Sequence, residues 1–82
     1  MIQNLEETIG LMTSPDYKDR FKAEYEQLCL RLNKLDAFLE KWDKDELKIT
    51  PKSPREWFER QRQAMADYGQ VLAARAIKEE IY

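Results

Sequence analysis

An apolar stripe of helical length is the feature that most constrains the fold of this chain. The stripe recurs at alternating steps of four and three residues, and its members are Phe21, Tyr25, Leu28, Leu32, Leu35, Leu39 and Trp42. This spacing places them all on one face of a helix. The chain has 82 residues and offers only one other long helical segment, so two helices alone would form a thin core. We therefore expect another protomer or a partner to cover part of the stripe.

Two helices are predicted in the first half of the chain. Residues 2–12 carry Ile2, Leu5, Ile9 and Met12 on one face. This segment is too short to be stable alone, so it must dock on another element or remain frayed. A long helix is expected over residues 15–42, with Ser14 as its N-cap and Pro15 in its first position. It is not interrupted, because the next proline or glycine is Pro51.

A connector over residues 43–53 leads to a second long helix over residues 54–80. Its start is predicted from Ser53-Pro54-Arg55-Glu56, which has the sequence of a capping box. The connector is long enough for the two long helices to run antiparallel. The sequence thus predicts one all-α domain over residues 1–82: an antiparallel hairpin of two long helices with a short N-terminal helix, self-associating into a helical bundle.

The second long helix carries two patterns that bear on its packing. The first is a mixed stripe expected to face the first helix: Trp57, Phe58, Gln61, Ala64, Met65, Tyr68, Val71, Leu72 and Arg75. In that hairpin Leu35, Leu28 and Phe21 would lie level with Gln61, Tyr68 and Arg75, respectively, within about one turn. The second is a strip of small residues where the N-terminal helix or another protomer could approach closely: Ala66, Gly69, Ala73 and Ala76.

The composition excludes most enzyme and metal chemistry. The chain has no histidine, one cysteine, and no Gly-rich phosphate loop or nucleophile elbow, so we expect no catalytic residues, metal site or cofactor. Cys29 is expected to be a half-buried thiol. A net charge of −2 is not typical of a duplex DNA binder, and no apolar run approaches membrane-spanning length. We expect a cytoplasmic protein.

Two sets of side chains are candidates for binding. Gln61 and Arg75 interrupt the stripe of the second helix, and they either fix its register or belong to a polar site between helices or protomers. In the second case an anionic or nucleotide-like ligand would be held by Tyr17, Arg20, Lys34, Tyr68 and Arg75. The predicted protein interface consists of Tyr25, Leu30, Phe38, Trp42, Trp57, Ala66, Gly69, Ala73 and Ala76.

Two stretches of the chain resemble a known family. They are Asp16–Leu28 with Lys34-Leu35 and Phe38-Leu39, and Gln61–Tyr68 with Val71-Leu72 and Arg75. Together they resemble small uncharacterised helical proteins of tailed phages and prophages of gut bacteria, including crAss-like phages. That family has no assigned activity, so the resemblance implies no catalytic residues.

What the resemblance implies is a kind of function. Small acidic helical phage proteins commonly act by binding. The leading expectation is a non-enzymatic protein that inhibits a host defence factor through protein contacts. One alternative is an oligomeric sponge that sequesters an anionic signalling nucleotide. Another is a structural or assembly component of a phage.

Overall fold

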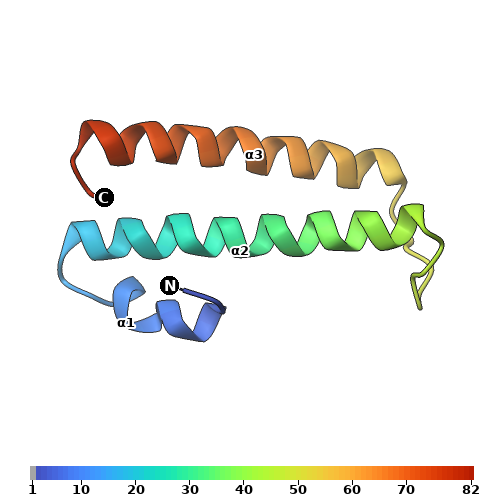
Figure 1. The fold of residues 1–82 in the computed structure, drawn as a ribbon, viewed down its shortest axis with the longest axis horizontal. Coiled ribbons are helices and arrows are strands. Elements are labelled where there is room, and N and C mark those ends of the chain that lie inside the picture. The colour runs from blue at the N-terminus through green and yellow to red at the C-terminus, as the bar shows by residue number, and fades with distance from the viewer. Residues whose placement is uncertain (1) are drawn as a thin grey trace.

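Two long antiparallel helices and a short N-terminal helical segment make up the fold (Figure 1). The structure is a computed structural model that describes residues 2–82. Its elements are the 3-10 helix η1 (Leu5–Thr8) and the α-helices α1 (Ile9–Met12), α2 (Tyr17–Asp43) and α3 (Arg55–Lys78). In Figure 1, α2 lies between α3 and the N-terminal segment. The predicted all-α hairpin with a short N-terminal helix is confirmed.

The start of α2 is capped two residues later than predicted. The Asp16 carboxylate accepts a hydrogen bond from the Lys18 backbone N–H at 2.9 Å, so Asp16 is the N-cap. The Ser14 hydroxyl accepts from the Asp16 N–H at 3.0 Å and donates to the Asp19 carboxylate at 2.9 Å. Ser14 therefore lies outside the helix and bonds to its cap, while Asp16 itself accepts from one of the free N–H groups of the first turn.

The predicted capping box at the start of α3 is wrong. The N-cap is Pro54, no side chain caps the helix, and the first helical residue is Arg55. Ser53 thus lies one position outside the cap, where its hydroxyl is out of place for the reciprocal bonds of a capping box. Arg55 instead joins the two long helices, because its guanidinium pairs with Asp43 at 2.8 Å and with Glu59 at 2.7 Å.

A small core holds α2 against α3. Its buried members are Phe21, Leu28, Leu72, Ala76 and Ile81, with Tyr25 and Met65 packed against them. Three contacts fix the register along the hairpin: Arg62 Nε donates to Asp36 at 2.6 Å, Gly69 faces Leu28, and the Arg75 guanidinium lies 5.0 Å from the centre of the Phe21 ring. The register predicted from the sequence holds within one turn.

The face that α3 turns to α2 differs in part from the predicted stripe. It runs through Phe58, Arg62, Met65, Gly69, Leu72 and Ala76, each at least half-buried. Five members of the predicted stripe are exposed, so their predicted place in the contact is wrong: Trp57, Gln61, Ala64, Tyr68 and Val71. The two stripes are one residue apart in the sequence, which is a rotation of about 100° around the helix axis. The stripe with Phe58 and Leu72 buries more apolar surface than the stripe that contains Gln61.

The N-terminal segment is docked on the side of α2 away from α3. Thr8 is fully buried, and its hydroxyl donates to the Leu5 carbonyl at 2.6 Å and accepts from Gln27 Nε2 at 2.8 Å. Ala23 lies buried on the same side of α2. The predicted short helix is therefore ordered, although it divides into η1 and α1. Within residues 2–82 neither long helix has an apolar stretch sufficient to cross a membrane.

The core of the hairpin can be tested at Leu72, which is 1% exposed. Leu72→Ala should lower the free energy of unfolding by about 2–5 kcal/mol, because it removes buried methyl groups and leaves a cavity. Val71→Ala, at a neighbouring position that is 57% exposed, should cost under about 1 kcal/mol. Urea denaturation followed by circular dichroism measures both. A larger loss for Val71→Ala than for Leu72→Ala would show that α3 faces α2 through the other stripe.

Candidate functional site

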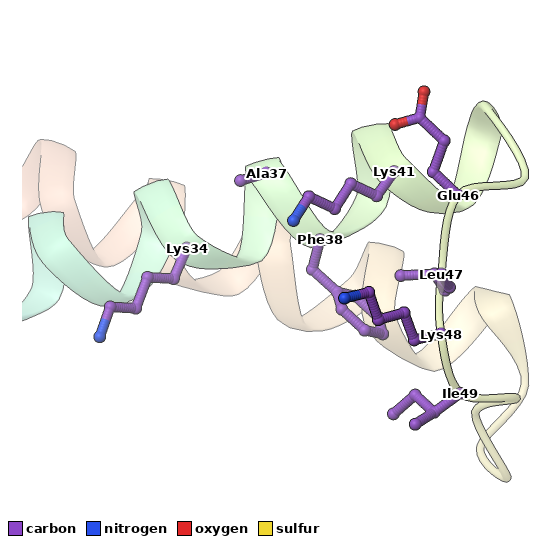
Figure 2. Close-up of a pocket in the computed structure, with 8 residues that line it drawn as sticks. All are labelled: Lys34, Ala37, Phe38, Lys41, Glu46, Leu47, Lys48 and Ile49. Atoms are coloured by element: carbon purple, nitrogen blue, oxygen red, sulfur yellow. The ribbon is translucent and has the colours of Figure 1, made fainter.

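A surface pocket of about 410 Å³ lies where α2 ends and the connector crosses it (Figure 2). Its apolar lining residues are Ala37, Phe38, Leu47 and Ile49. Its charged lining residues are Lys34, Lys41, Glu46 and Lys48. The pocket thus joins an apolar surface to a group of side chains with an excess of positive charge.

Helical and extended spacing bring these residues together. Lys34, Ala37, Phe38 and Lys41 recur at the i, i+3, i+4 and i+7 positions of one face of α2. The connector then crosses this face, with Leu47 and Ile49 on either side of Lys48 along the chain. Leu47 is half-buried, whereas Ile49 is 68% exposed at the edge of the pocket. Of these two apolar connector residues, only Leu47 is therefore partly covered by the rest of the chain.

The three lysines of this pocket are available to a ligand. Within residues 2–82 none of their ammonium groups takes part in an ion pair, unlike Lys44, which pairs with Glu40 at 2.9 Å. Figure 2 shows Lys41 and Lys48 extending in the same direction along α2, while the Glu46 carboxylate points away from them. Cations beside apolar lining residues fit an anionic ligand that has a flat apolar part.

An aromatic cluster packs against Phe38 of the pocket lining. The Phe38 ring lies 5.5 Å from that of Phe58 and 5.9 Å from that of Trp42, and Trp42 also contacts Phe58 at 5.4 Å between ring centres. The Arg55 guanidinium lies 5.2 Å from the Trp42 ring centre. These contacts fix the Phe38 side chain, so this part of the pocket lining is formed before any ligand arrives.

A second polar cluster lies at the open end of the hairpin. The Arg75 guanidinium donates to the Tyr17 hydroxyl at 2.6 Å and to the Glu79 carboxylate at 3.0 Å, and the Tyr17 hydroxyl donates to Glu79 at 2.8 Å. Hydrogen bonds from Tyr17 and then from Arg75 lower the pKa of Glu79. The same carboxylate raises the pKa of Arg75. Because Glu79 already neutralises Arg75, this cluster ties α3 to α2 and leaves little charge for a ligand.

The five predicted ligand residues do not form one site within a single chain. Tyr17 and Arg75 meet at the open end, whereas Lys34 lies in the pocket at the connector end. Arg20 donates to the Ser14 carbonyl at 2.9 Å, and Tyr68 is exposed on α3. The sequence reading missed Lys41 and Lys48, although their signal is present: Lys41 shares the helical face of Lys34, and Lys48 lies between the alternating apolar residues of the connector.

Several predicted interface residues are used inside the chain. Ala76 is 5% exposed in the hairpin core, and Gly69 faces Leu28, so these small residues allow α3 to approach α2. Tyr25 packs on the core and contacts the Tyr82 ring at 6.0 Å. Ala66, Ala73, Leu30, Phe38 and Trp42 are half-buried. Of the large predicted interface side chains only Trp57 is exposed, at 59%.

Cys29 and its neighbours have no features of a reactive site. Burial raises the pKa of the Cys29 thiol, which therefore stays protonated and weakly nucleophilic at neutral pH. Burial, together with the nearby Glu26 carboxylate, raises the pKa of Tyr82 to about 12. Among residues 2–82 no three side chains of the metal-ligating types gather closely enough to hold a metal ion.

The fold and the pocket define a small helical-hairpin protein whose clearest site is suited to binding. A family model described as Sequestin matches residues 15–78, and the chain belongs to this family. The match covers both long helices and the connector. The family's name refers to sequestration, which is a binding role rather than catalysis. Comparisons with curated proteins and with solved structures found no match.

The cluster at the open end predicts a dependence of stability on pH. The pKa of Glu79 is lower in the folded chain than its ordinary value of 4.5. Its ionised form therefore stabilises the fold above pH 4.5, and this contribution disappears as the pH falls through the lowered value. Glu79→Gln should unfold at a lower temperature than the wild type at pH 7, and the difference should shrink below pH 4.5. Thermal unfolding at several pH values measures it, and a constant difference would exclude an ionic role.

Proposed function

We propose that this protein sequesters an anionic small molecule with a flat apolar part, and that the ligand is a signalling nucleotide. The observation that carries this proposal is the pocket at the connector end, which Lys34, Lys41 and Lys48 line together with apolar residues that include Phe38. The lysines would bind phosphate oxygens, and the base would lie against Phe38, Leu47 or Ile49. The family's name agrees with a protein that holds its ligand rather than converting it.

The chemistry of the pocket favours binding over turnover. Its lining has no histidine, cysteine or hydroxyl side chain, and the carboxylate of Glu46 points away from Lys41 and Lys48 (Figure 2). Its volume falls at the lower end of the range typical of small-molecule sites, which suits a mononucleotide or one half of a cyclic dinucleotide. In a phage-encoded protein, such binding would remove a signal of the host defence from the host cytoplasm.

Nucleotide binding can be tested with the purified chain. Cyclic mononucleotides and cyclic dinucleotides should raise its melting temperature, because a ligand that binds only the folded state stabilises it. Titration calorimetry then gives the affinity of the nucleotide that gives the largest shift. Lys41→Gln combined with Lys48→Gln should weaken binding about tenfold or more, since two charge-assisted contacts are lost.

Lys52→Gln is the matched control, since Lys52 is an exposed lysine of the same connector that does not line the pocket. The affinity of this variant should stay within about twofold of the wild type. Affinity should also fall as salt is added, because the site is open to solvent. The proposal fails if no nucleotide shifts the melting temperature, or if the control weakens binding as much as the double variant.

A second candidate function is inhibition of a host protein by direct contact. A second pocket of about 300 Å³ lies between α1 and α2 and is lined in part by Ile9, Met12 and Arg31. Ile9 and Met12 are 53% and 47% exposed beside this pocket. A helix or strand of a host protein could cover them. The test is the capture of a host protein from lysate on the purified chain. Loss of this capture in Met12→Glu, with no loss in the double variant Lys41→Gln and Lys48→Gln, would favour this function.

A further inference from the structure

A second, mostly apolar stripe on α3 is exposed along most of its length. Its members alternate at steps of four and three residues: Trp57, Gln61, Ala64, Tyr68, Val71 and Arg75. Trp57, Tyr68 and Val71 are 59%, 43% and 57% exposed. The stripe follows α3 for about 27 Å and lies about 100° around the helix from the face that packs on α2. A stripe of this spacing is typical of a helix that packs on another helix.

We propose that a second copy of this chain covers the stripe, with the two α3 helices packed antiparallel about a two-fold axis. In the register centred on position 66, Trp57 lies opposite Arg75 of the second copy. The same register places Gln61 opposite Val71 and Ala64 opposite Tyr68. Each pair occurs twice, as a two-fold axis requires.

The pairs of this register are complementary in size and charge. Ala64 leaves room for the Tyr68 ring, so a small and a large side chain meet on each side of the axis. The exposed Trp57 indole can stack on the Arg75 guanidinium. In its own chain this guanidinium already lies 5.0 Å from the centre of the Phe21 ring, so it would be held between two aromatic rings.

A parallel arrangement of the two helices fits less well. It would place Arg75 against Arg75 and Tyr68 against Tyr68, while Ala64 against Ala64 would leave a gap. The corresponding flank of α2 does not offer an alternative cover, because it carries the charged residues Glu24 and Arg31. The stripe is therefore best matched by an antiparallel copy of itself.

One residue opposes this dimer and so identifies the register. Asp67 lies beside the stripe, one position from its centre, so the Asp67 carboxylates of the two copies approach one another near the axis. Within its own chain Asp67 accepts a hydrogen bond from Gln63 at 2.9 Å, and it has no ion pair among residues 2–82. Asp67→Asn removes the repulsion and keeps the size, so it should strengthen the dimer about 1.5- to 2-fold.

Sedimentation equilibrium over about 1–200 μM tests the proposal on the full chain. The monomer mass is 9.9 kDa, and the wild type should approach twice this mass as concentration rises. Ala64→Arg should weaken dimerisation tenfold or more, because the new side chain fills the space of Tyr68. Gln70→Arg, on a part of α3 away from the stripe, should leave it unchanged. Circular dichroism shows that each variant keeps its helix content.

The proposal is overturned by any of three results. The first is a wild type that remains monomeric up to 200 μM, which would leave the stripe to a different partner. The second is an equal effect of Ala64→Arg and Gln70→Arg, since only the former lies on the stripe. The third is an Asp67→Asn variant that dimerises no better than the wild type, because the carboxylates then do not meet near the axis. Ligand affinity does not enter this measurement, so the result is independent of the nucleotide proposal.

Discussion

The contact between α2 and α3 is the interaction on which the rest of the structure depends. Its main buried cluster consists of five side chains, so truncation of a single one is expected to destabilise the whole hairpin. Ion pairs and hydrogen bonds hold the two ends of the hairpin together. Arg55 pairs with Asp43 at the connector end, and Arg75 bridges Tyr17 and Glu79 at the open end. Exposed ion pairs add little each, but these hold the register that brings the connector across α2.

The sequence was sufficient to predict the helices, their antiparallel direction and their register. Strong periodicity and the absence of proline and glycine over residues 16–50 account for this success. The face of α3 was harder to predict, because two stripes offset by one residue compete for α2. The capping box failed for a related reason: Ser53 and Pro54 are both acceptable at a helix start, and only the geometry shows that Pro54 is the N-cap.

The pocket could be predicted only in part. The sequence predicts Lys34 as a ligand residue and Phe38 as an interface residue, and it places them on different surfaces. Their meeting with Lys48 depends on the path of the connector across α2, which helical periodicity does not determine. Conversely, Tyr17 and Arg75 do meet as the hairpin register requires. Their partner Glu79 lies in the last turn of the chain and converts an apparent anion site into a structural link.

The two stripes of α3 explain why this chain can remain small. The buried cluster between the long helices is small, so its stabilisation is modest. The exposed stripe with Trp57 and Tyr68 lowers solubility unless it is covered. An antiparallel dimer would bury it and would place the two connector pockets at opposite ends of the assembly. The proposed register pairs residues of α3 alone, so association would stabilise the fold without using the lysines that line either pocket.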